Sequence, residues 1–335
     1  MMQITPAELN TLTALIESFP QLRAKSLTEV TYKKVRYPVI AVELGSEDTD
    51  KPCVLFVGGV HGVERIGTQV ILALLESLLV RLEWDSQLQH LLTEIRVAFV
   101  PIVNPIGLLN GTRCNGQHVD LMRNAPLDAT TKVTFLVGGQ RVSSLLPWYR
   151  GKNGMEQETL ALIRYVESLQ SNASSVISLD AHSGFGMSDH IWFPFASSQQ
   201  PIKSLGQIYH LKQLYQASFP HHSHYQFSPQ SLIYRTHGDI WDYLATKQHD
   251  TLLLPLTLEM GSWAWVKKNP RQIFNFAGLF NPQKQHRHVR TLRKHTVLMQ
   301  FLMDLAASRV IEDMSSELIT RQYDAAMQYW YQHNE

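Results

Sequence analysis

Cysteine is scarce in this sequence, with only Cys53 and Cys114 among 335 residues. Two cysteines provide neither a disulfide framework nor a zinc site built from thiolates. The first ten residues show no basic segment followed by an apolar run, so no signal peptide is expected. We therefore expect a cytoplasmic protein, kept in a reducing compartment.

The sequence also lacks an excess of charge of one sign, because 30 Lys and Arg residues are balanced by 29 Asp and Glu residues. Binding along a nucleic-acid backbone needs a surplus of cations, so no nucleic-acid partner is expected. The longest apolar candidate, residues 69–82, contains Glu76 and Arg81 and predicts a buried helix rather than a membrane span. No membrane partner is expected. The hydrophobic fraction of 44% is sufficient for a large core.

Helical and strand patterns alternate along the chain, without internal repeats or low-complexity linkers. This alternation predicts an α/β fold: a mixed, mostly parallel twisted sheet with helices on both faces. We expect a single domain over residues 1–335, with a helix and edge strands in residues 1–50 and a helical tail in 310–335. Buried strands are predicted from continuous apolar runs at 53–57, 95–103, 175–179, 190–195 and 251–258.

Histidine and glutamate follow several of these predicted strands. His61 and Glu64 come after the first, His182 follows the third, and Glu259 ends the last. Open parallel sheets bind ligands beyond the carboxyl ends of their strands, so these four side chains are expected at one edge. A His-x-x-Glu pair alone is weak evidence for a metal site, since roughly one such pair would arise by chance in a chain this rich in histidine.

The residue types indicate a metal-dependent hydrolase. His61, Glu64 and His182 would hold one zinc ion and leave a fourth position for water. Glu259 is costly to bury at the end of an apolar strand, and it is a candidate for the general base that takes the water proton. The alternative for Glu259 is an ordinary salt-bridged carboxylate.

The order of motifs over residues 54–261 resembles that of the carboxypeptidase A-like zinc carboxypeptidases, a resemblance that also implies the fold. Seven elements match in order: His61 with Glu64; Asn104 with Gly107; Val-Asp-Leu-Met-Arg-Asn at 119–124; Glu156, Glu158 and Thr159 after Gly151; His182 with Ser183; Tyr234, Gly238 and Asp242; and Glu259.

The resemblance implies further roles for single residues. Arg113 would polarise the scissile carbonyl, and Arg123 would pair with a substrate carboxylate. Tyr234 would close over the substrate. Asp120 would fix the tautomer of His61.

Two features depart from the family pattern. Met122 stands where the family has an Asn beside the carboxylate-binding Arg, so the carboxylate contact has one amide donor fewer. Arg113 precedes Arg123 by only ten residues, which is similar to the aspartoacylase and succinylglutamate desuccinylase branch.

We therefore expect an enzyme, a zinc metallopeptidase that cleaves a peptide or amide bond near a free carboxylate. The first alternative is a zinc amidohydrolase or deacylase acting on a small N-acyl amino acid or a cell-wall peptide. The second alternative is a catalytically silent binding protein of the same fold. The expected substrate is a small peptide or acylated amino acid that carries a carboxylate, and the oligomeric state is unknown.

Other clusters have ordinary interpretations. His221, His222 and His224 predict a solvated loop more than a second metal site. Trp241 hints at a pocket loop, and Trp263 and Trp265 either line a substrate wall or pack in the core. A basic run predicts one solvated helix face; it comprises Lys284, Arg287, Arg290, Arg293 and Lys294.

Overall fold

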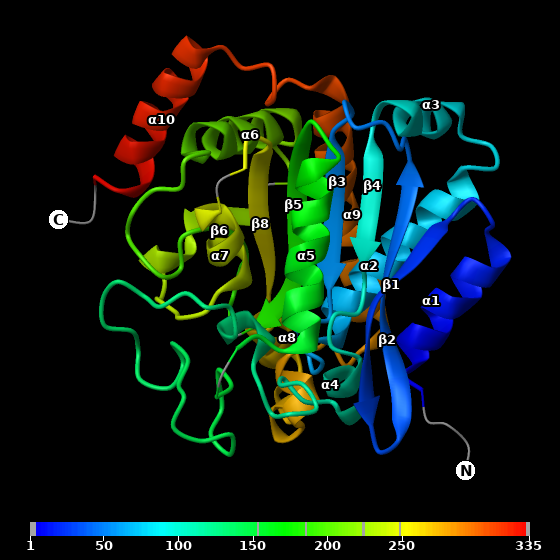
Figure 1. Cartoon of the computed structure of the whole chain (residues 1–335), viewed down its shortest axis with the longest axis vertical. Helices are drawn as coiled ribbons and strands as arrows, with labels where there is room; N and C mark the ends of the chain where they lie inside the picture. The colour runs from blue at the N-terminus through cyan, green and yellow to red at the C-terminus, as the bar shows by residue number, and fades with distance from the viewer. Residues whose placement is uncertain (1–4, 153, 185, 223–224, 248, 333–335) are drawn as a thin grey trace.

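The computed structural model describes residues 5–152, 154–184, 186–222, 225–247 and 249–332. Its centre is one eight-stranded sheet in the order β1-β2-β4-β3-β5-β8-β6-β7 (Figure 1). Strands β3, β4, β5 and β8 run parallel, whereas β1, β2 and β6 pair antiparallel with a neighbour. The strands are β1 (Arg23–Tyr32), β2 (Val35–Gly45), β3 (Cys53–Gly58), β4 (Arg96–Val100), β5 (Ser175–Gly184), β6 (Asp189–Phe193), β7 (Tyr225–Pro229) and β8 (Leu252–Gly261).

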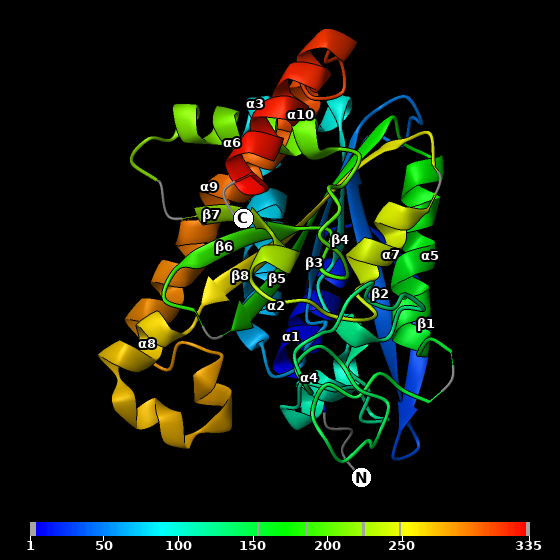
Figure 2. The same ribbon diagram turned by 90° about the vertical axis from the view of Figure 1, so that its left-hand side faces the viewer.

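Helices cover both faces of the sheet, as Figures 1 and 2 show. One face carries α1 (Ala7–Ser18), α2 (Arg65–Arg81), α3 (Ser86–Glu94) and α9 (Gln285–Ser308). The opposite face carries α5 (Gln157–Ser171) and α7 (Ile240–Thr246). Helices α6 (Leu205–Ser218) and α10 (Ser316–Trp330) pack together and extend the first core past β7. Short elements are α4 (Pro105–Asn110), α8 (Trp263–Lys268), η1 (Leu121–Arg123), η2 (Gln230–Leu232), η3 (Pro270–Phe274) and η4 (Phe276–Leu279).

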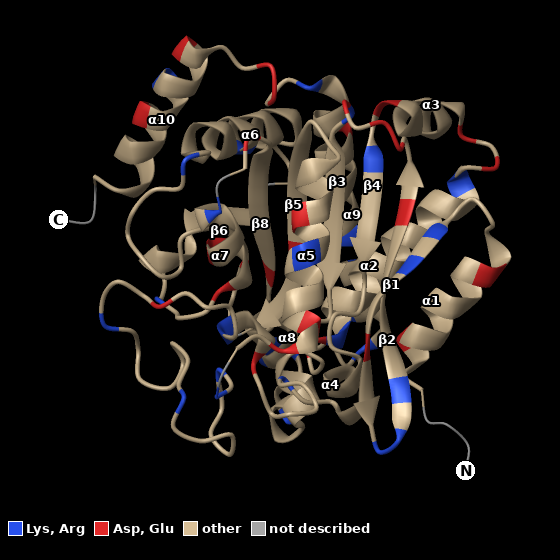
Figure 3. Ribbon diagram, in the orientation of Figure 1, with Lys and Arg blue, Asp and Glu red and all other residues tan. Residues whose placement is uncertain are grey.

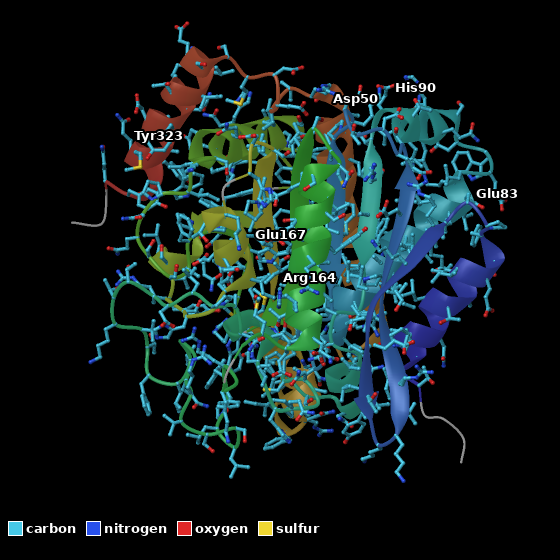
Figure 4. The ribbon with its side chains drawn as sticks, in the orientation of Figure 1. Asp50, Glu83, His90, Arg164, Glu167 and Tyr323 are labelled. Atoms are coloured by element: carbon cyan, nitrogen blue, oxygen red, sulfur yellow. The ribbon has the colours of Figure 1, made fainter. Side chains whose placement is uncertain are left out.

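Burial on both faces explains why the central strands are continuously apolar. Every residue of β3 and β4 is buried. The covering helices are amphipathic: α5 turns Leu162 and Val166 into the core, whereas Arg164 and Glu167 lie on its outer face (Figure 4). The mixed, mostly parallel sheet with helices on both faces is thus confirmed. Among the described residues, no helix is both long and apolar enough to cross a membrane.

Strand β7 and helix α3 are among the elements that were not predicted from the sequence. Strand β7 is five residues long and ends in Pro229, so it lacks a clear alternating pattern. Helix α3 has nine residues, and Asp85 caps its N-terminus. The Asp85 carboxylate accepts hydrogen bonds from the backbone N–H groups of Gln87 and Leu88. The helix of the tail begins at Ser316 rather than at 310, because the Ser315 hydroxyl accepts from the Leu318 N–H.

Candidate active site

The predicted site residues meet at the carboxyl ends of the parallel strands, at the lower edge of the sheet in Figure 1. His61 and Glu64 lie in the turn between β3 and α2. His182 of β5 pairs in register with Glu259 of β8, and paired residues of parallel neighbours project from the same face. The topology therefore brings together four side chains that are up to 198 positions apart, from 61 to 259.

His61, Glu64 and His182 form a compact cluster whose potential ligand atoms all lie within 4.8 Å of one another. His61 Nδ1 is 2.9 Å from Glu64 Oε1, and His182 Nδ1 is 3.1 Å from Glu64 Oε2. All three residues are buried, with 3–4% of each exposed. Two imidazoles and a carboxylate are the ligand types that zinc accepts.

The Nε2 atoms of both imidazoles face carboxylates. His61 Nε2 is hydrogen-bonded to Asp120 Oδ1 at 3.1 Å. His182 Nε2 lies 3.0 Å from Asp180 Oδ2, although its N–H is off the line to that oxygen. This arrangement favours the tautomer that carries hydrogen on Nε2, which leaves a lone pair on Nδ1.

The Nδ1 atoms of His61 and His182, together with the Glu64 carboxylate, then fit a cation. The two Nδ1 atoms are only 3.1 Å apart, and both face the Glu64 carboxylate. Lone pairs and a carboxylate that converge in a buried site repel one another unless a cation lies between them. The residues present therefore fit a zinc ion.

Carboxylates around the cluster are held in the ionised form. Burial opposes ionisation of Glu64, yet the neighbouring His61 and His182 keep its pKa well below the usual range. Burial likewise opposes ionisation of Asp120, but Arg113 and His61 hold the pKa of that carboxyl well below normal. Both groups are thus available as anions toward a metal ion and its histidine ligand.

Glu259 lies beside this cluster in a space that a glycine leaves open. A Cβ at residue 184 would come within 2.1 Å of Glu259 Oε1, so a larger residue there would displace the Glu259 carboxylate. Burial, together with the nearby Glu64 carboxylate, raises the pKa of Glu259 to about 8. A cation bound in the His61–Glu64–His182 cluster would lower the pKa of Glu259.

Arg113 contacts two of the carboxylates described above. Its Nε donates to Asp120 Oδ2 at 2.8 Å, and its Nη1 donates to Glu64 Oε1 at 3.0 Å. Arg113 also borders the cavity that the cluster faces. This position suits a cation that approaches the reacting carbonyl.

The cavity next to the cluster has a volume of about 550 Å³ and is bordered by Arg113, Arg123, Tyr234 and Glu259. The Arg123 guanidinium is almost fully buried and donates to the carbonyls of Val137 and Met122. Among the described residues, no carboxylate forms an ion pair with Arg123. Met122 also borders the cavity.

Tyr234 lies between η2 and α7, and its ring meets Trp192 edge to face with centroids 5.7 Å apart. Burial raises the pKa of the Tyr234 phenol, although the nearby guanidinium of Arg123 opposes this rise. The phenol therefore stays neutral and can donate a hydrogen bond into the cavity.

The role of the Asn104-to-Gly107 motif was not deduced from the sequence. Asn104 Oδ1 accepts from the Gly107 N–H at 2.7 Å, and its Nδ2 donates to the carbonyls of Val60 and Arg113. A Cβ at Gly62 would come within 1.9 Å of the Gly107 backbone. The motif therefore holds the His61–Glu64 turn and the Arg113 segment against each other.

Two supporting residues, Asn281 and Asp180, were not predicted from the sequence. Asn281 Oδ1 accepts from the N–H of Ile66 in the first turn of α2, and its Nδ2 donates to the Val63 carbonyl. Asp180 faces His182, two residues away, and Oδ2 of Asp180 also accepts from Trp241 Nε1 at 2.9 Å. The D-x-H spacing on a buried strand is the signal that could have revealed Asp180.

The remaining aromatic and histidine predictions can now be placed. Trp241 is fully buried in α7 and belongs to the core rather than to a pocket loop. Trp265 packs partly against the core and borders a second groove. His222 Nδ1 is 2.9 Å from the Tyr215 hydroxyl, and His221 is exposed. His224 lies outside the described residues, so the interpretation of the histidine cluster as a solvated loop, rather than a second metal site, stays a prediction.

Curated relatives of this chain are carboxypeptidases. Carboxypeptidase D of Anas platyrhynchos is 25% identical over 196 residues, which cover 57% of this chain and 13% of that protein. The carboxypeptidase N catalytic chain of Rattus norvegicus is 31% identical over 157 residues, or 42% of this chain and 33% of that protein. The chain thus matches a third or less of these relatives' length.

Solved structures show the same fold. Bovine thrombin-activatable fibrinolysis inhibitor, solved with tick carboxypeptidase inhibitor, has a TM-score of 0.66 at 16% identity, covering 91% of this chain and 98% of that one. Carboxypeptidase A from Helicoverpa armigera has a TM-score of 0.66 at 15% identity, covering 89% and 72%. The sequence profile of the family described as zinc carboxypeptidase matches residues 9–285. The chain therefore belongs to the zinc carboxypeptidase family.

Proposed function

We propose that this protein is a zinc-dependent carboxypeptidase that cleaves the peptide bond next to a free C-terminal carboxylate. One observation carries the substrate part of the proposal. The buried Arg123 guanidinium borders the same cavity as the His-Glu-His cluster and Glu259, without an ion pair to a described carboxylate. A buried cation of this kind is costly unless an anion joins it, and a substrate carboxylate would supply that anion.

The proposed mechanism assigns one task to each side chain. His61, Glu64 and His182 would hold zinc, which when bound polarises the scissile carbonyl and lowers the pKa of the attacking water. Glu259 would accept the water proton and pass it to the leaving amine. Arg113 would stabilise negative charge developing on the carbonyl oxygen. Arg123 would pair with the terminal carboxylate, and Tyr234 would donate a hydrogen bond to the bound substrate.

The other two functions have less support. The relatives are named as carboxypeptidases, and none of those given above is a deacylase. A silent binding protein would tolerate loss of a ligand or of the base, whereas His61, Glu64, His182 and Glu259 are all present and adjacent. Met122 is the one feature that weakens the carboxylate contact, and it bears on substrate preference rather than on the reaction.

A substrate panel tests the proposal. The zinc-loaded protein is given a short peptide with a free C-terminus, the same peptide with a C-terminal amide, and an N-acyl amino acid. Losing a hydrogen bond to a charged group costs about 1.5–3 kcal/mol, so kcat/KM for the amide should fall by roughly ten-fold or more. Equal cleavage of both peptides, or cleavage of the N-acyl amino acid alone, would refute a carboxypeptidase.

A further inference from the structure

A second groove of about 530 Å³ lies between α8 and the N-terminal half of α9, which run close together at the lower left of Figure 2. Its lining is basic, comprising Lys268, Arg287, Arg290, Arg293 and Lys294, with Trp265 in the wall. None of these residues borders the catalytic cavity. The groove is therefore a separate feature of the molecule.

The cations of this groove are largely uncompensated. Arg290, Arg293 and Lys268 are exposed, and none of their side chains forms a hydrogen bond or ion pair with a described residue. No carboxylate is found in the described lining. Elsewhere the signs are mixed, as the front view in Figure 3 shows, and the net charge of the chain is only +1. The groove therefore concentrates positive charge in an otherwise balanced protein.

Two further cations have partners that fix the shape of the groove. Arg287 donates to the carbonyls of Trp265 and Lys268 at 3.3 and 3.2 Å, which ties α9 to α8. Lys294 contacts Asp189, whose other oxygen accepts from the Gly261 N–H at the end of β8. The walls are thus held by contacts within the protein, while Arg290, Arg293 and Lys268 stay available to a ligand.

The spacing of these cations on α9 is unfavourable for the helix itself. Arg290 and Arg293 are three positions apart, and like charges at this spacing face each other and repel. Helix α9 has no acidic residue in its first turn to offset them. A bound anion would relieve this repulsion.

We propose that the groove binds a small oligophosphate anion. Arg290 and Arg293 share one face of α9, and Lys268 borders the same groove from α8. Several cations around a small volume require a ligand with closely spaced negative charges. Guanidinium groups match the geometry of phosphate oxygens, and Trp265 offers a flat apolar surface beside them.

Calorimetric titration with inorganic tripolyphosphate tests this site in the full chain at low ionic strength. Arg290→Gln with Arg293→Gln should weaken binding by at least about ten-fold, because a hydrogen bond to a charged group is worth roughly that factor. The conservative pair Arg290→Lys with Arg293→Lys keeps the charge and should retain more of the affinity. Hydrolysis of the short peptide with a free C-terminus should be unchanged in both variants.

Matched controls separate the groove from general electrostatics and from the catalytic cavity. Lys25→Gln with Arg321→Gln removes the same charge from β1 and α10 and should change affinity by less than about two-fold. Arg123→Gln should leave tripolyphosphate binding intact. Absence of binding, equal weakening by the control pair, loss on Arg123→Gln, or tighter binding of duplex DNA that tripolyphosphate cannot displace would each overturn the proposal. ATP in place of tripolyphosphate tells whether a nucleotide or the inorganic anion binds more tightly.

Discussion

At the residue scale, the orientation of His182 depends on a carboxylate outside the metal cluster. Asp180 Oδ2 lies 3.0 Å from His182 Nε2 and is itself held by Trp241 Nε1. Asp180→Asn should lower zinc affinity by about 10–100-fold, because partners of this kind set the tautomer and basicity of a ligand. Competition with a chelator measures the affinity.

His182→Ala is the reference for that experiment, since it removes a ligand and should abolish stoichiometric zinc. Trp241→Phe is the milder variant, because it removes the N–H donor to Asp180 and part of the fused ring but keeps an aromatic side chain in the core. Unchanged zinc affinity in Asp180→Asn would assign Asp180 a purely structural role.

Met122 is a second residue that is expected to affect substrate preference, because it borders the cavity together with Arg123. Met122→Asn should raise kcat/KM by about ten-fold for peptides with a free carboxylate and should change little for amidated ones. The new amide is buried in the free protein, so we expect stability to fall by about 1–3 kcal/mol. Parallel kinetics and urea unfolding measure the two effects.

Met122→Leu is the matched control, since it keeps an apolar side chain of similar size and should alter neither quantity much. If Met122→Asn instead improves both kinds of peptide equally, or impairs both, Met122 does not belong to the carboxylate contact.

At the element scale, helix α2 is capped from a distant part of the chain. Glu64 occupies its N-cap position, but the Glu64 carboxylate faces the metal cluster rather than the helix backbone. Asn281 supplies the missing acceptor to the Ile66 N–H at 2.9 Å. Asn281→Ala should therefore lower the free energy of unfolding by about 1–2 kcal/mol and also weaken zinc binding.

Asp85→Ala removes a comparable cap from α3, which lies away from the metal cluster. It should reduce stability by a similar amount, measured by urea unfolding, and leave zinc affinity unchanged. Equal zinc affinities in the two variants would show that capping of α2 does not position Glu64.

At the scale of the whole molecule, α10 closes the core beyond β6 and β7. The Trp330 ring is buried against Phe193 with centroids 4.9 Å apart, and its Nε1 donates to the Phe227 carbonyl at 2.8 Å. Trp330→Ala should destabilise the fold by about 3–5 kcal/mol, as large-to-small core substitutions do. Thermal unfolding measures the loss.

Trp330→Phe loses the N–H donor and part of the fused ring but keeps an aromatic ring in the core, so its effect on stability should be smaller. Since α10 is far from the site in Figure 1, kcat should be retained by both variants while they are folded. A kcat loss in folded Trp330→Phe would show that α10 influences catalysis.

Local signals explain how much of this molecule could be predicted. The apolar runs of β3, β5 and β8 and the polar residues that follow them predicted the sheet and its edge correctly. His61, Glu64, His182 and Glu259 are together because parallel strands bring their carboxyl ends to one edge. Asn281 and the Asp180–Trp241 contact could not be deduced, since each joins residues 61 to 215 positions apart without a local pattern.

Replacement of Glu259 tests the central claim most directly. Glu259→Gln has nearly the same shape but cannot accept the water proton, and it leaves the His-Glu-His cluster untouched. We predict full zinc content and normal peptide binding in this variant, with kcat reduced by about 10²–10⁴-fold. Near-normal kcat in the zinc-loaded variant would contradict the assignment of Glu259 as the base and, with it, the proposed mechanism.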